Sequence, residues 1–264
     1  MAKPVICFDL DGTLLDENEI IHPNDIELLS IIRNTNYLVS TGRALPSIKG
    51  VFSLNGLFRG EKIPIPIVSQ NGAVLYGPEE QLHEFHSFNI ETQNLLLNCV
   101  RKFPQVPFFL FAENEIYLIN PNQLAQHYAS MWFYPLKNLK NAGLPNVSKV
   151  MALSYKRDLL QDFVNMIQPL EIEASFSLNF LLEITPAGVN KGKGLERLLS
   201  YLNWELGAVF YAGDGGNDLP VFKISARSFV PITASEHIKT QADYIIDTKK
   251  TGLLSPILQN AGIN

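Results

Sequence analysis

The chain has 264 residues, 46% of them hydrophobic, which is enough to bury one large core or two smaller ones. Its 26 acidic and 21 basic residues give a formal net charge of −5, and no long basic run is present that would follow a nucleic-acid backbone. We therefore expect a folded protein with no nucleic-acid partner.

The cysteines and the apolar segments exclude further classes of protein. Cys7 and Cys99 lack the spacing of a disulfide framework or a zinc site, which favours a reducing, cytoplasmic location. The apolar run 4–8 is too short for the core of a signal peptide, and no run approaches the roughly 18 apolar residues that cross a bilayer. We expect neither export nor a membrane partner, and we expect a monomer or a small homo-oligomer.

The first part of the chain alternates short apolar runs with polar, glycine-containing loops. A helix is expected over 24–33. The β-prone runs and the loops that follow them are 4–8 before 9–13, 37–40 before 41–43, and 65–69 before 70–72. A strand followed by a loop and then a helix or connection is typical of a parallel sheet, which collects functional groups along one edge.

The last part of the chain repeats this plan. We expect a helix over 191–202, a buried strand over 208–212, a loop over 213–218, a helix over 219–224, and short strands near 229 and over 244–246. The two ends of the chain therefore predict one α/β core with a Rossmann-like parallel sheet, made of residues 1–81 and 186–264.

Residues 82–185 have a different pattern of paired short strands and helices. Strands are expected at 108–111, 116–119, 147–155, 172–176 and 180–184, with a hairpin loop at 112–115 and helices at 90–103 and 156–167. An α+β domain inserted into the α/β core is the simplest account of this pattern.

Two aspartates follow the first strand. Residues i and i+2 of an extended chain point the same way, so Asp9 and Asp11 are aimed into one site, where they repel each other without a cation. Mg²⁺ prefers one or two carboxylates together with phosphate and water oxygens. Asp214 and Asp218 offer further oxygen ligands from a neighbouring strand end. Although residues 9–12 alone also fit a polar turn, the four aspartates together predict a magnesium site.

Hydrogen-bond donors and positive charge accompany the carboxylates. In loop-like or helix-start positions stand Thr41, Arg43, Asn71 and Lys191. A phosphate dianion needs such groups, and phosphoryl transfer is accelerated by a cation and fixed donors around the equatorial oxygens. We therefore predict phosphoryl transfer in which Asp9 attacks phosphorus, while Asp11 protonates the leaving oxygen and later deprotonates water.

Four segments resemble, in order, the motifs of the haloacid dehalogenase (HAD) superfamily. They are Asp9-Leu-Asp-Gly-Thr-Leu14, Thr41-Gly42-Arg43, Lys191 and Gly213-Asp-Gly-Gly-Asn-Asp218. The position of the insert is similar to that of the large cap, called C2B, in the type IIB or Cof-like subfamily. The resemblance implies the HAD fold and a Mg²⁺-dependent phosphatase, a phosphoric monoester hydrolase that works through a phosphoaspartate intermediate.

The resemblance also implies roles for the catalytic residues. Asp9 becomes phosphorylated and Asp11 is the acid/base, while Thr41 and Lys191 hold the phosphoryl oxygens. Family dehalogenases lack a carboxylate at the position of Asp11, so its presence favours the chemistry of phosphate esters.

The remaining positions carry over as ligands of the metal and of phosphate. Mg²⁺ would be held by Asp9, the backbone carbonyl of Asp11 and Asp214, with Asp218 orienting Lys191 or supporting a metal-bound water. The positions expected to bind or adjoin the phosphate are Gly42, Arg43, Asn71 and Asn217. The resemblance implies a small phosphorylated metabolite as substrate, expected to be a sugar phosphate.

Two alternatives stay open. A phosphomutase or phosphotransferase of the same fold would need the cap to grip a second phosphate, and the insert carries only Arg101 and Arg157, both on expected helices. A non-catalytic protein that binds a phosphorylated metabolite is disfavoured because the acidic, metal and phosphate groups are all present. Asn179 and Glu183, on a strand that leads back to the core, face either the substrate or solvent.

Overall fold

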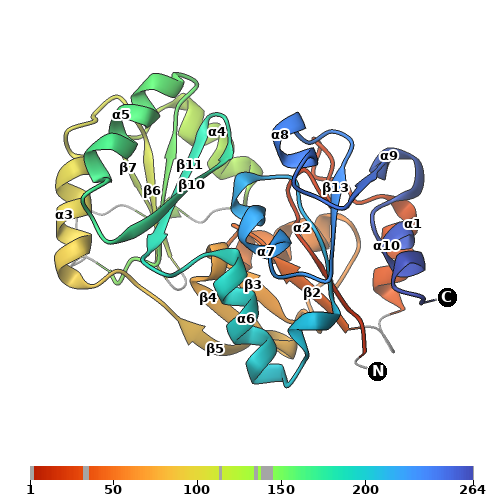
Figure 1. The fold of residues 1–264 in the computed structure, drawn as a ribbon. Coiled ribbons are helices and arrows are strands. Elements are labelled where there is room, and N and C mark those ends of the chain that lie inside the picture. The colour runs from red at the N-terminus through yellow and green to blue at the C-terminus, as the bar shows by residue number, and fades with distance from the viewer. Residues whose placement is uncertain (1–2, 32–35, 113–114, 134–135, 138–144, 264) are drawn as a thin grey trace.

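Two sheets form the centre of the computed structural model, which describes residues 3–31, 36–112, 115–133, 136–137 and 145–263 (Figure 1). The larger sheet contains both ends of the chain. In spatial order its eight strands are β14 (Tyr244–Ile246), β13 (Arg227–Pro231), β12 (Val209–Ala212), β1 (Val5–Phe8), β2 (Asn36–Ser40), β3 (Ile67–Ser69), β4 (Val74–Gly77) and β5 (Gln81–Phe85).

The strands from β14 to β3 are parallel, whereas β3, β4 and β5 pair antiparallel. At the centre, Phe8 of β1 pairs with Ala212 of β12 on one side and with Val39 of β2 on the other. The carboxyl ends of these three strands therefore meet at one edge of the sheet, which is where the structure collects the loops expected to be functional.

Helices cover both faces of this sheet (Figure 1). They are α1 (Pro23–Ser30), α2 (Leu45–Leu54), α6 (Lys191–Leu202), α7 (Leu219–Phe222), α8 (Glu236–Lys239), α9 (Thr248–Thr251) and α10 (Leu254–Asn260). Short 3-10 turns lie at Gln70–Gly72, Pro78–Glu80, Leu206–Ala208 and Gly216–Asp218. Side chains of a strand alternate between faces, so Ile6 and Phe8 pack in one apolar cluster while Val5 and Cys7 pack in another.

The second sheet belongs to the inserted segment. Its six strands in spatial order are β10 (Ile172–Leu178), β11 (Leu181–Pro186), β9 (Lys149–Leu153), β6 (Phe108–Phe111), β7 (Ile116–Ile119) and β8 (Leu136–Lys137). Its helices are α3 (Ile90–Val100), α4 (Gln123–Met131) and α5 (Arg157–Ile167). Phe108 and Leu110 pack with α3 and α5, whereas Phe109 and Phe111 pack with α4 on the opposite face.

The predicted fold class, an α/β core with an inserted α+β cap, is confirmed. The expected boundary between residues 81 and 82 stays a prediction, but β5 pairs with β4, so the larger sheet continues to Phe85. Of the expected helix over 24–33, residues 32–33 lie outside the described residues, as do residues 113–114 of the expected hairpin loop. In the described part of the chain, no helix combines the length and apolar character needed to cross a membrane.

Gly72, beside the larger sheet, packs against the start of α6. It has a φ of 92°, and an added Cβ would lie 2.4 Å from the carbonyl oxygen of Asn190, the N-cap of α6. Gly188 has a φ of 70° but nothing within 4 Å of an added Cβ. The two glycines therefore share the left-handed backbone and differ in packing.

We predict that Gly188→Ala lowers the free energy of unfolding by about 1–3 kcal/mol, the cost of the left-handed conformation. Gly72→Ala loses a further amount of about 1–3 kcal/mol because the new methyl group overpacks the α6 junction. Urea denaturation of both variants measures the difference. Equal losses would show that Gly72 does not set this junction.

Candidate active site

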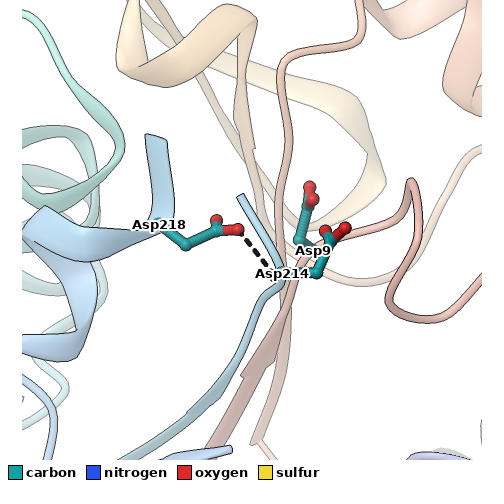
Figure 2. A group of neighbouring side chains, drawn as sticks. All are labelled: Asp9, Asp214 and Asp218. Carbon is teal, nitrogen blue, oxygen red and sulfur yellow. Dashed lines mark hydrogen bonds between the residues drawn. The ribbon is translucent and has the colours of Figure 1, made fainter. Parts of the chain in front are cut away.

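The expected carboxylates converge at the carboxyl edge of the larger sheet. Asp9 follows β1 and Asp214 follows the adjacent β12, and the Asp9 backbone N–H donates to the carbonyl oxygen of Ala212 at 2.9 Å. Figure 2 shows the Asp9 and Asp214 carboxylates beside each other, with Asp218 approaching from the far side of the loop. One carboxylate oxygen from each of the three lies within 4.8 Å of the others.

Lys191 is the cation at the centre of this cluster. Its side chain is fully buried at the first turn of α6, with Nζ 2.9 Å from Asp9 Oδ1 and 2.7 Å from Asp218 Oδ1. Burial opposes the charged ammonium, but the two carboxylates outweigh it and hold the pKa of Lys191 above its ordinary value. Lys191 is therefore protonated throughout the physiological pH range.

Asp218 has both oxygens occupied by protein donors. Its Oδ1 accepts from Lys191 Nζ and from the Tyr211 hydroxyl at 2.5 Å, and its Oδ2 accepts from the backbone N–H groups of Asp214 and Gly215 at 2.9 Å each. These bonds suit a residue that orients Lys191 and the 213–218 loop. They leave Asp218 less suited than Asp9 or Asp214 to bind a metal directly.

Asp9 and Asp214 carry the features of a site for a hard cation. Asp9 Oδ1 is buried and receives no well-aligned hydrogen bond, although Lys191 Nζ is close. Burial raises the pKa of Asp9 despite the opposing charge of Lys191, and burial together with Asp218 raises the pKa of Asp214 to about 7. A divalent cation would relieve both costs, so these oxygen donors fit Mg²⁺.

Asp11 lies outside this group and is bound by Arg43. The guanidinium Nε lies 2.9 Å from Asp11 Oδ2, and Nη2 contacts both Asp11 Oδ1 and Glu19 Oε2 at 2.5 Å. Desolvation favours the neutral carboxyl, but the positive charge of Arg43 outweighs this effect and holds the pKa of Asp11 below its ordinary value. The Asp11 side chain is 46% exposed, so its carboxylate remains reachable from the cleft.

The predicted phosphate donors are linked to one another by hydrogen bonds. Thr41 Oγ1 accepts from the Arg43 backbone N–H at 3.1 Å, which leaves its own proton available to donate. Asn71, held at a φ of 57°, donates its backbone N–H to the carbonyl oxygen of Thr41 at 3.0 Å. Asn217 Nδ2 donates to Asn71 Oδ1 at 3.1 Å. The predicted residues are thus brought together, while their roles stay predictions.

The cap adds a buried ion pair to the site. Lys149 Nζ lies 2.8 Å from Glu183 Oε1 and donates to the Gly42 carbonyl oxygen at 2.5 Å, and Asn217 Nδ2 lies 3.4 Å from Glu183 Oε2. Burial favours the neutral form of Glu183, but Lys149 and Asn71 outweigh this effect and hold the pKa of Glu183 below its ordinary value. Glu183 was a candidate from the sequence, whereas Lys149 was not predicted; its one signal is its place as a lone lysine in the apolar run of β9.

Other positions weighed from the sequence lie away from the site. The carbonyl oxygen of Asn179 accepts from Arg157 on the cap surface, at 3.0 Å. Arg101 bonds the side chain of Asn98 at 2.8 Å and is exposed. None of these three side chains lines the cavity of about 740 Å³ that contains Asp9, Asp11, Asp214 and Lys149.

The model of the haloacid dehalogenase-like hydrolase family matches residues 6–255 of the chain. The 5-amino-6-(5-phospho-D-ribitylamino)uracil phosphatase YwtE of Bacillus subtilis is 22% identical over 91% of each chain. The HMP-PP phosphatase of Yersinia enterocolitica is 23% identical over 89% of this chain and 85% of its own. A solved HAD subclass IIB sugar phosphatase superposes with a TM-score of 0.82 at 20% identity, covering 99% of this chain and 100% of its own.

The chain belongs to the haloacid dehalogenase-like hydrolases, and it shares its fold with the solved subclass IIB sugar phosphatase. This confirms the family predicted from the four motifs. The comparisons support the hydrolase class, while the residue roles rest on the geometry described above.

The buried pair gives a stability prediction. Lys149→Met leaves the Glu183 carboxylate buried without its cation and lowers the free energy of unfolding by about 3–5 kcal/mol. Adding Glu183→Gln recovers part of this loss because the uncompensated charge is removed. Denaturant unfolding of the single and double variants measures the coupling.

The matched control is the exposed pair of Lys193 and Glu196, 2.8 Å apart on α6. The corresponding Lys193→Met and Glu196→Gln variants change stability by less than about 1 kcal/mol. If Lys149→Met costs no more than Lys193→Met, the cap pair is not a buried, coupled interaction.

Proposed function

We propose that the chain is a Mg²⁺-dependent phosphatase that hydrolyses a small phosphorylated metabolite through a phosphoaspartate on Asp9. The observation that carries the proposal is the position of Asp9, whose buried Oδ1 lies 2.9 Å from Lys191 Nζ. Asp214 and Asn217 line the same cavity as Asp9, and Thr41 follows β2, the strand paired with β1. Both the nucleophile and the charge that stabilises the transferring group are present there.

In the first step, an Asp9 carboxylate oxygen attacks phosphorus and the bond from phosphorus to the leaving oxygen breaks. Asp11 gives its proton to that oxygen, so the alcohol leaves neutral. In the second step, Asp11 takes a proton from water, the water oxygen attacks phosphorus, and the bond to Asp9 breaks to release phosphate. Lys191 and the Thr41 hydroxyl hold the phosphoryl oxygens during both steps.

Arg43 has a role in preparing Asp11 that follows from its contacts. It binds Asp11 through two guanidinium nitrogens and holds the pKa of the carboxyl below its ordinary value, which favours the ionised form. Asp11 must carry a proton to act as the acid in the first step, so substrate binding has to weaken this pair. Arg43 is therefore proposed as the group that positions Asp11.

Mg²⁺ fits the oxygen donors of Asp9 and Asp214, with the Asp11 backbone carbonyl as the third protein ligand that the family resemblance implies. When bound, Mg²⁺ would neutralise negative charge on the transferring phosphoryl group. Asp218, with four donors on its carboxylate, is assigned to orienting Lys191 and the loop.

The relatives support phosphate esters as substrates. Two are named for phosphatase activity on 5-amino-6-(5-phospho-D-ribitylamino)uracil and on HMP-PP, and a structural neighbour is titled a sugar phosphatase. For a mutase, the cap would need to grip a second phosphate, yet Arg101 and Arg157 are both outside the cavity lining. Hydrolysis is therefore favoured over transfer to a second sugar.

The nucleophile is tested by Asp9→Asn. We predict that this variant loses at least about 1,000-fold in phosphate release from p-nitrophenyl phosphate and a panel of metabolite phosphates in Mg²⁺, because an amide is a poor nucleophile. The matched control, Asp158→Asn on the exposed face of α5, keeps full activity. Undiminished turnover by Asp9→Asn in a folded protein would overturn the proposal.

The raised pKa of Asp214 predicts how Mg²⁺ binding depends on pH. Below about pH 7 the metal-free carboxyl is protonated, and the proton competes with the cation. We predict that Mg²⁺ binds about tenfold more weakly at pH 6 than at pH 8, with release of a proton on binding at pH 6.

Isothermal titration in buffers of different ionisation enthalpy measures both the affinity and the proton release. In Asp214→Asn, binding should be weak at both pH values and release fewer protons. Equal affinity of the native protein at pH 6 and pH 8 would contradict the assignment of Asp214 as a ligand.

A further inference from the structure

The cap presents a group of aromatic rings to the cavity. Tyr128 and Trp132 come from the end of α4, and Phe180 lies in the turn between β10 and β11. The Tyr128 ring lies 4.8 Å from the Trp132 ring and 5.4 Å from the Phe180 ring, the latter pair being nearly parallel at 29°. All three residues line the same cavity as Asp9.

Tyr128 and Phe180 are peripheral to the apolar core on this face of the cap. That core is made by buried residues such as Ala125, Ala129 and Phe109, and the two rings pack against its edge while staying partly exposed. Residues needed only to fill a core are usually fully buried. These two rings therefore have surface directed into the cavity.

The surroundings of the rings are also apolar. Met131 and Leu181 line the cavity from the cap, and Ile20, 46% exposed, lines it from the core loop that follows Asp9. The cavity volume of about 740 Å³ is in the range that encloses a drug-sized ligand. The lining also carries polar side chains, among them Asp16, Glu19 and Ser177, so the aromatic and aliphatic residues form one part of a mixed surface.

This chemistry is poorly suited to a bare sugar. The hydroxyl groups of a sugar need hydrogen-bond partners when they are buried, and Met131, Phe180 and Leu181 offer none. The Tyr128 hydroxyl already lies 3.3 Å from that of Tyr155. Aromatic faces instead bind planar rings by stacking or edge-to-face contact.

We propose that the ester cleaved at this site carries a planar, largely apolar ring in its leaving group, and that the ring binds against Tyr128 and Phe180. The proposal rests on the phosphatase function proposed above and names its substrate class. Lys149 and Glu183 line the same cavity and offer a donor and an acceptor to the atoms that link ring and phosphate. Tyr128 and Phe180 are thus specificity residues.

The test compares phosphate esters that differ only by the ring. The two pairs are riboflavin 5′-phosphate with ribitol 5-phosphate, and 2-phenylethyl phosphate with ethyl phosphate. We expect kcat/KM to be at least about tenfold higher for the ring-bearing member of at least one pair, mainly through KM, because stacking stabilises bound substrate and transition state alike.

The variants separate the ring from the bulk of the side chain. Tyr128→Leu and Phe180→Leu should reduce the preference for the ring-bearing ester about two- to tenfold. Tyr128→Phe, which keeps the ring and loses the hydroxyl, should retain the preference. Tyr244→Leu, at the β14 edge of the larger sheet and outside the cavity lining, is the matched control and should behave as the native protein.

The outcomes distinguish this inference from the proposed function. Equal kcat/KM within both pairs, insensitive to the leucine variants, would overturn the ring inference while leaving the phosphatase intact. Turnover that survives Asp9→Asn would overturn the phosphatase mechanism instead. If no ester of either pair is hydrolysed, the affinity of each ester for the Asp9→Asn protein is measured in its place. Affinities that are equal within each pair, or too weak to detect, would overturn the ring inference.

Discussion

The buried ammonium group of Lys191 is the interaction on which the rest of the site depends. It lies between Asp9 and Asp218, at 2.9 and 2.7 Å, and has no exposed surface. Without this cation, two carboxylates would be buried at one strand edge with no compensating charge, which costs several kcal/mol. Lys191 thereby connects the end of β1, the start of α6 and the loop after β12, and in the proposed mechanism it supplies the charge that phosphoryl transfer needs.

A second buried cation connects the cap to this centre. Lys149 reaches from β9 to the Gly42 carbonyl oxygen and to Glu183, and Glu183 in turn approaches Asn217 of the core. Lys191 is thus held by carboxylates of the core, whereas Lys149 lines the cavity from the cap and contacts the core at Gly42.

Much of the core and its site could be predicted because the signals are local. A buried strand followed by Asp9, Thr41 or Asp214 fixes where each side chain emerges, and parallel pairing brings the three together. The helix α4 was not predicted, since the buried positions of Gln123–Met131 are the small residues Ala125 and Ala129, whose packing against the cap sheet is a tertiary contact. Lys149 was missed because a charge inside an apolar strand is explained only by a partner distant in sequence.

The stereochemical course at phosphorus tests the central claim most directly. Hydrolysis of a phosphorothioate monoester made chiral at phosphorus with two oxygen isotopes, in water labelled with the third, gives a chiral inorganic thiophosphate whose configuration can be determined. Two successive in-line displacements, first by Asp9 and then by water, predict retention of configuration. Inversion would mean that water attacks the ester directly, and would contradict a phosphoaspartate on Asp9.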